Sequence, residues 1–207
     1  MAKKIYFLLI CLGTLGFSSL MFSNTSKGFP EDSIGSKAKK FLSKDLETIQ
    51  KMIKSCNSAV LEKYDLPTLD LVRNDEDWLK YSNEGHNPFY IHADFNGDGK
   101  QDHVFLANKK TANGYAVFVV LSTNKGQELQ KILEWNGSTA LGQGLAIAKP
   151  GTYKTAAGKG YWEPAPGEPE KVDLKLPGID FFKFESADSV FYWDTKKKAF
   201  ASVAMSD

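Results

Sequence analysis

Hydrophobic residues recur at helical spacing between Lys37 and Tyr64. Successive apolar positions lie three or four residues apart, and this spacing lines one face of an α-helix. The positions are Leu42, Leu46, Ile49, Ile53, Cys56 and Val60. Lysines and acids fill the opposite face, and Pro67 follows as a helix breaker. The pattern predicts an amphipathic surface helix packed on a sheet, with Cys56 as a small core residue rather than a reactive thiol.

A shorter pattern after Pro67 predicts two more elements. In Thr68–Val72 the first four residues alternate between polar and apolar, and the segment is expected to form a short strand. Asn74 is followed by three acids, which is typical of a capped helix start because acids stabilise the positive end of the helix dipole. The buried side of that helix is expected to consist of Trp78, Leu79 and Tyr81.

From Pro88 onward the pattern changes to extended segments separated by turn residues. The short connections between the first four segments predict an antiparallel meander. These four predicted strands are Phe89–Ala93, His103–Ala107, Tyr115–Ser122 and Leu129–Trp135. A second set of predicted strands consists of Leu145–Ala148, Thr152–Ala156, Phe181–Phe184, Val190–Trp193 and Phe200–Ala204.

Composition supports a single folded unit. The chain has 207 residues, of which 42% are hydrophobic and 13% aromatic, enough for one compact core. We expect residues 37–207 to form one α+β domain, with the amphipathic helix packed on a mainly antiparallel β-sheet. The segment 158–177 is rich in proline and glycine, with Trp162 near its start, and is expected to be a long loop.

The first residues have the pattern of a secretory signal. Lys3 and Lys4 precede an apolar run from Ile5 to Phe22, which is the order of a basic and then a hydrophobic signal region. We expect residues 1–23 to be a signal peptide and residues 24–36, which are polar, to be a flexible tether. The protein would then be exported, to the periplasm or the exterior. The alternative is an uncleaved signal that anchors the chain in the inner membrane through residues 5–22.

Charge and cysteine content narrow the classes of partner. Residues 1–23 hold Lys3 and Lys4 and no acid, so the remainder has 24 basic and 25 acidic residues. Arg73 is the only arginine, and the bidentate contacts of arginine to phosphates and bases are therefore missing, so we expect no nucleic-acid partner. Cys56 is the only cysteine beyond residue 23, which leaves a metal, the core or a partner to supply rigidity.

The run from Asp94 to Asp102 has the spacing of a calcium loop. Calcium takes six to eight oxygen ligands, and a loop can supply them when alternate residues point inward around a sharp turn. Asp94, Asn96 and Asp98 occupy positions 1, 3 and 5. Gly99 permits the turn at position 6, the backbone carbonyl of Lys100 stands at position 7, and Asp102 adds a carboxylate at position 9. The alternative is a solvated Asn-Gly hairpin turn.

These residues resemble the strand–loop–strand calcium repeat of the FG-GAP/VCBS type, over about Tyr90 to Leu106. Position 12 of the loop is Phe105 in a strand-like segment, whereas EF-hands and dockerins carry an acid there on a helix. The resemblance implies a Ca²⁺ ion held by the side chains of Asp94, Asn96, Asp98 and Asp102 and the carbonyl of Lys100. A single copy is present, so we do not expect a β-propeller. The C-terminal segment 179–194 also resembles exported bacterial proteins that contain such a loop.

Two functional hypotheses follow from the sequence. The first is a non-catalytic exported calcium-binding module, in which the metal stabilises a β-hairpin and other surfaces bind a protein or a glycan. The second uses the histidines near the loop, His86, His92 and His103. In that alternative the protein is a calcium-dependent extracytoplasmic hydrolase with His92 or His103 as the base, and Glu163 or Glu185 as a supporting acid.

Overall fold

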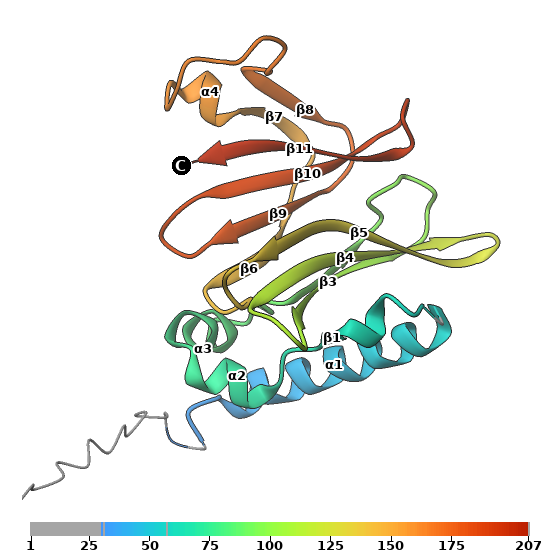
Figure 1. Cartoon of the computed structure of the whole chain (residues 1–207), viewed down its shortest axis with the longest axis vertical. Coiled ribbons are helices and arrows are strands. Elements are labelled where there is room, and N and C mark those ends of the chain that lie inside the picture. Colours follow the sequence, from blue (N-terminus) through green and yellow to red (C-terminus); the bar gives the residue numbers. More distant parts are fainter. Residues whose placement is uncertain (1–29, 31, 57, 207) are drawn as a thin grey trace, which may run out of the picture.

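The computed structural model describes residue 30, residues 32–56 and residues 58–206 (Figure 1). The predicted signal or anchor in residues 1–23 and most of the predicted tether lie outside these residues. In the part of the chain that the structure describes, no helix is both long and apolar enough to span a membrane.

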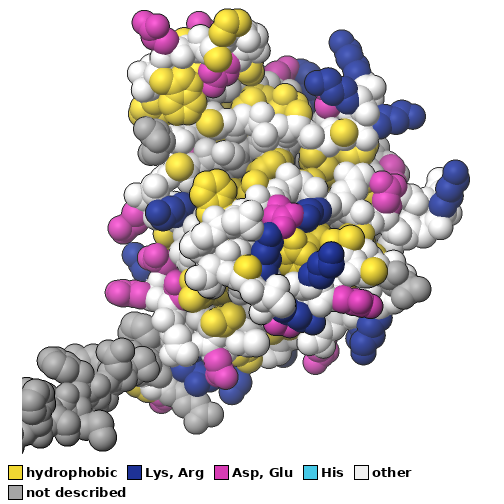
Figure 2. Space-filling model, viewed as in Figure 1, with side chains coloured by type: hydrophobic (Ala, Val, Ile, Leu, Met, Phe, Trp, Pro, Cys, Tyr) yellow, Lys and Arg dark blue, Asp and Glu magenta, His cyan; other side chains and the backbone are white. Residues whose placement is uncertain are grey.

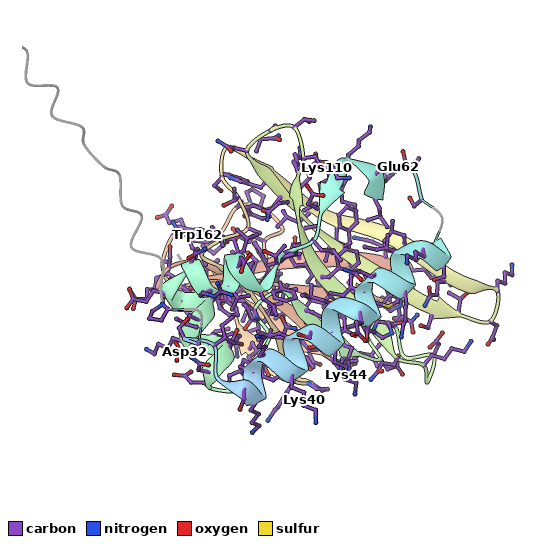
Figure 3. The ribbon with its side chains drawn as sticks, turned by 90° about the horizontal axis from the view of Figure 1, so that it is seen from below. Asp32, Lys40, Lys44, Glu62, Lys110 and Trp162 are labelled. Atoms are coloured by element: carbon purple, nitrogen blue, oxygen red, sulfur yellow. The ribbon has the colours of Figure 1, made fainter. Side chains whose placement is uncertain are left out.

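Helix α1 (Ser36–Cys56) runs along the lower side of the molecule in Figure 1. It buries Ala38, Leu42, Ile49 and Met52 in the main core, while its outer side carries exposed lysines such as Lys40 and Lys44 (Figure 3). The predicted end of the helix at Tyr64 is wrong. The short 3₁₀ helix η1 (Leu61–Lys63) intervenes, and Tyr64 enters strand β1 (Tyr64–Asp65), where pairing with Lys109 holds it in the sheet.

The segment after Pro67 is helical, so the predicted strand at Thr68–Val72 is wrong. The hydroxyl of Thr68 accepts a hydrogen bond from the Leu71 amide at 3.2 Å and caps α2 (Leu69–Asn74). Asn74 is the last residue of α2, and Asp75 rather than Asn74 caps α3 (Glu76–Asn83), through a 2.8 Å bond from the Trp78 amide. Among the predicted buried residues of α3, Trp78 and Leu79 are buried and Tyr81 is half-buried.

The first sheet is the predicted antiparallel meander. Its strands are β2 (Tyr90–Ala93), β3 (Asp102–Lys109), β4 (Gly114–Thr123) and β5 (Gly126–Asn136), and each pairs with the next. Strand β1 shares with β2 the edge of β3 that faces away from β4. Residues 104–107 of β3 and 114–121 of β4 are buried on both faces, so the centre of this sheet forms the centre of the core.

The second sheet consists of β6 (Gln143–Ala148), β9 (Gly178–Lys183), β10 (Asp188–Asp194) and β11 (Ala199–Ser206). The strands are antiparallel in the order β11-β10-β9-β6. The two sheets meet where the Leu145 amide of β6 donates to the Pro88 carbonyl before β2, at 3.0 Å. Leu145, Ile179 and Phe191 join the core of the first sheet. Among the described strands, β5 lies at one edge of the first sheet, with β1 and β2 at the other. The edges of the second sheet are β6 and β11, and no closed barrel forms among the described strands.

The segment 158–177 is not a loop throughout, which corrects the prediction. Strand β7 (Gly151–Lys154) pairs with β8 (Lys171–Leu174), and α4 (Ala156–Lys159) lies between them along the chain (Figure 1). Ala156 therefore begins a helix instead of ending the predicted strand. Strand β8 forms because Val172 and Leu174 alternate with polar residues and pack against the second sheet. Trp162, labelled in Figure 3, donates its indole N–H to Glu168 and closes the remaining loop.

Candidate metal site

The predicted calcium loop connects β2 to β3. Ala93 pairs with Asp102 and His92 pairs with His103, so the two ends of the loop are held side by side by the strand ladder. Gly97 and Gly99 have φ angles of 79° and 81°, a left-handed conformation that glycine adopts without a steric penalty. The local sequence therefore folds as a tight turn between two fixed strand ends.

The carboxylate of Asp94 accepts three backbone hydrogen bonds within the loop. Its Oδ1 accepts hydrogen bonds from the amides of Gly97 at 2.7 Å and Asp98 at 3.2 Å, and its Oδ2 accepts one from Gly99 at 2.9 Å. Asn96 and Asp98 repeat this arrangement, since each side-chain oxygen accepts the amide two residues ahead. Alternate polar side chains thus turn back onto the loop and fix its conformation.

Asp102 is fully buried, unlike the other acids of the loop. One carboxylate oxygen accepts the Phe95 amide at 3.0 Å, and the other accepts the Ser122 amide of β4 at 2.9 Å. Burial raises the pKa of the Asp102 carboxyl, and the nearby charge of Asp98 raises it further, although the backbone hydrogen bonds oppose the shift. A carboxylate can accept about four hydrogen bonds or metal contacts, so the Asp102 carboxylate retains capacity for a ligand.

The donor chemistry of this loop fits calcium better than zinc, because all five predicted ligands are oxygens. Asp98 and Asp102 are close enough for one charge to affect the other, and a cation between acids lowers the cost of such repulsion. The described side chains of the loop are not gathered as closely as a bound metal requires. In the ranges 32–56 and 58–206, no three side chains drawn from His, Cys, Asp and Glu gather as a metal cluster.

The loop also lies against the segment between β8 and β9. A Cβ atom on Gly97 would lie 3.0 Å from Cδ1 of Leu176, in the segment between β8 and β9. Leu176 also lines a hollow of about 310 Å³ together with Tyr192, Trp193 and the acids Asp173 and Asp194. Sequence reasoning missed Leu176 and Ser122, because no local pattern indicates contacts between residues that are far apart in the sequence.

The histidines lie on two different parts of the structure. His92 and His103 are cross-strand neighbours with ring centroids 6.2 Å apart. The Nδ1 of His103 lies 2.8 Å from the Tyr90 hydroxyl, and the Nδ1 of His92 lies 2.7 Å from the Gln101 amide. Burial lowers the pKa of His103, and the neighbouring His92 lowers it further. His86 instead stacks on Tyr81 of α3.

The contacts of these histidines differ from those that the hydrolase alternative uses. Tyr90 and Gln101 are their hydrogen-bond partners in the described residues, in place of the predicted acids Glu163 and Glu185. The tautomer of each ring decides which atom donates. The arrangement links a tyrosine to two imidazoles beside the loop, and the carboxylate whose charge interacts with His92 and Tyr90 is Asp45 of α1 rather than Glu163 or Glu185.

A further carboxylate that sequence reasoning missed lies in the second sheet. Burial, and then the charge of Asp188, raises the pKa of Asp180 to about 6. Its Oδ1 is buried and has no hydrogen-bond partner among the described residues. Asp180 stands in the aromatic run of β9, where the sequence pattern indicates a core strand and gives no sign of the unpaired carboxyl.

Comparison of the chain with protein-family models, with curated proteins and with solved structures finds no match. The function is therefore argued from the residues and their geometry.

Proposed function

We propose that this protein is an exported, non-catalytic calcium-binding module that acts by binding a protein or a glycan. In this proposal Ca²⁺ is held by the side chains of Asp94, Asn96, Asp98 and Asp102 and by the carbonyl of Lys100. The metal would stabilise the β2–β3 hairpin. Export rests on the basic and apolar pattern of residues 1–23.

The observation that carries the calcium proposal is the pair of acids at positions 5 and 9 of the loop. Asp102 is buried and its pKa is raised in part by Asp98, so the loop bears a charge cost that a divalent cation would offset. Asp102 is also hydrogen-bonded to β4 through Ser122. A metal ligated by Asp102 would therefore stabilise three strands and not the loop alone.

The binding role is supported by the surface beside the loop. The hollow that Leu176 lines combines two aromatic side chains with acids and lysines, a mixture of apolar faces and polar groups found in ligand sites. Asp173 is paired with Lys175, and Asp194 lies 3.8 Å from the Lys197 ammonium. Each carboxylate has a lysine of the same protein beside it, and a neutral ligand rich in hydroxyl groups fits this balance of charge.

Thermal unfolding with calcium added or chelated tests the metal. A loop without an acid at position 12 belongs at the weak end of calcium sites, with Kd about 10⁻⁴–10⁻³ M. A concentration of about 10 mM calcium should then stabilise the fold by about 1–3 kcal/mol, by mass action. Magnesium at the same concentration is the matched control. An unchanged melting temperature in calcium and in EDTA would refute the calcium proposal.

A further inference from the structure

Strand β5 leaves one edge of the first sheet open. It pairs with β4 from Gly126 to Asn136, and no strand of the described residues pairs with its other edge. Such an edge presents a row of backbone N–H and C=O groups that can accept another strand. Figure 1 shows β5 at the boundary between the two sheets, with β9 next above it.

A bulge interrupts β5 before its last residues. Lys131 opposes Phe118 and Leu133 opposes Val117, so Ile132 is the extra residue. Beyond the bulge, Leu133 and Trp135 share the face of Tyr115. The Tyr115 ring lies 6.0 Å from the ring of Phe181 in β9, which shows that this face looks toward the second sheet.

A mainly apolar hollow of about 350 Å³ lies between this face of β4 and β5 and the second sheet. Its walls include Leu133 and Trp135 from β5 and Phe181 and Phe191 from the second sheet. Trp135 is 54% exposed, although a large aromatic side chain stabilises most when it is covered. Figure 2 shows hydrophobic side chains at the surface on this face of the molecule, between groups of lysines and acids.

We infer that the open edge of β5 and the adjoining hollow bind an extended segment of a partner protein, which adds a strand to the first sheet. Backbone hydrogen bonds to β5 would supply affinity, and an apolar side chain of the partner would fill the hollow against Trp135. The inference rests on the partner-binding role proposed above and names the partner as a protein segment. It does not depend on calcium.

The charges of β5 argue for a different protein rather than a second copy of this chain. Full-length antiparallel pairing of two β5 strands would place Lys131 opposite Lys131 and Glu128 opposite Glu134. Like charges directly opposite each other are destabilising. The rim of the hollow carries one cation and one anion, Lys183 and Asp188, so it selects for neither an acidic nor a basic partner. A partner segment with an apolar side chain and no charge fits both the charge pattern of β5 and the balanced rim of the hollow.

The test is a selection from a random 12-residue peptide display library against the purified full chain, followed by affinity measurements on synthetic copies of the enriched peptides. We expect sequences in which apolar residues alternate. Trp135→Ala should weaken their binding at least tenfold. Tyr161→Ala is the matched control, because Tyr161 is equally exposed at 54% but lies after α4, and it should bind as the wild type does.

N-methylation of the peptide separates strand addition from side-chain docking. Methyl groups on one alternating set of peptide amides should abolish binding, and on the other set should leave it unchanged, because only one edge of the added strand faces β5. Three results would each overturn the inference. The first is equal enrichment of the same peptides on the wild type and on Trp135→Ala, and the second is peptide affinity that N-methylation does not change. The third is a dimer of the wild-type chain in sedimentation that is lost in Trp135→Ala. Measurements in calcium and in EDTA should agree, so a failed metal site would show in the melting curves and not here.

Discussion

Leu176 packs against Gly97, so the turn of the candidate metal loop is in contact with the segment that precedes β9. Gly97→Ala should lower the free energy of unfolding by about 1–2 kcal/mol for the left-handed backbone, and further for the crowding against Leu176. Gly99→Ala is the control, because Gly99 has a similar φ and no atom within 4 Å of an added Cβ. Urea unfolding should show the larger loss at Gly97, and Leu176→Ala should relieve the excess.

Substitutions at Asp98 and Asp102 should distinguish the contribution to metal binding from the contribution to fold stability. Asp102→Asn leaves a buried backbone amide without its acceptor and should cost about 1–3 kcal/mol even in EDTA. Asp98→Ala removes an exposed loop side chain and should change stability in EDTA by less than about 1 kcal/mol, yet abolish stabilisation by calcium. The check is the melting temperature of both variants with and without calcium. Equal calcium responses in Asp98→Ala and the wild type would contradict the ligand assignment.

Asp180 should make the protein less stable as the pH rises from about 4 to about 6. The folded chain holds the Asp180 proton up to about pH 6, whereas the unfolded carboxyl loses it near its ordinary value, so the free energy of unfolding falls across this window. The titratable groups that face it are Asp188 and Tyr81. Asp180→Asn should remove the fall and stabilise the protein at pH 7 by about 1–3 kcal/mol.

The measurement for Asp180 is urea unfolding at several pH values between about 3.5 and 7. The advantage of Asp180→Asn should vanish at the acidic end, where both folded and unfolded wild-type chains are protonated. Asp173→Asn is the control of opposite sign, because the exposed Asp173 is paired with Lys175, which lowers its pKa. A gain for Asp180→Asn that is independent of pH would show that its charge is not the cause.

Trp78 joins α3 to the second sheet through one buried hydrogen bond. Its indole N–H donates to the Gln143 carbonyl at 2.6 Å, and the side chain is fully buried. Trp78→Phe leaves that carbonyl without its donor and should cost about 1–3 kcal/mol in urea unfolding. Trp162→Phe removes a similar bond to Glu168 in a partly buried loop and should cost less. An equal loss in the two variants would mean that burial does not set the difference.

Patterns local to a strand were enough to predict most of the sheets. The segments around β3 and β4 have uninterrupted apolar runs, and both strands form close to their predicted limits. Thr68–Val72 is too short to separate the two periods, because Leu69 and Leu71 alternate as in a strand while Leu69 and Val72 have the i, i+3 spacing of a helix. The decisive feature is the Thr68 cap. Strand β8 was missed because four residues in a Pro- and Gly-rich segment carry too short a pattern.

The candidate site likewise has features that local sequence predicts and features that depend on distant contacts. The alternation of Asp94, Asn96 and Asp98 and the glycine at position 6 are local, and the sequence predicts the turn that they form. The burial of Asp102 depends on β4, which approaches only when the meander is complete. The raised pKa of Asp180 comes from burial and from Asp188 on the neighbouring strand β10, and the hollow beside Trp135 is lined from both sheets. No spacing within one segment indicates either feature.

The order of the strands has a consequence for how the chain assembles. β2 to β5 pair with their neighbours in sequence, whereas β6 must wait for β9, which follows β7, α4 and β8. Contacts that close short loops cost less entropy and form sooner. The first sheet, with the loop at its first hairpin, can therefore form before the second. If the protein is exported as proposed and folds outside the cytoplasm, calcium there would reach this hairpin before the second sheet has formed.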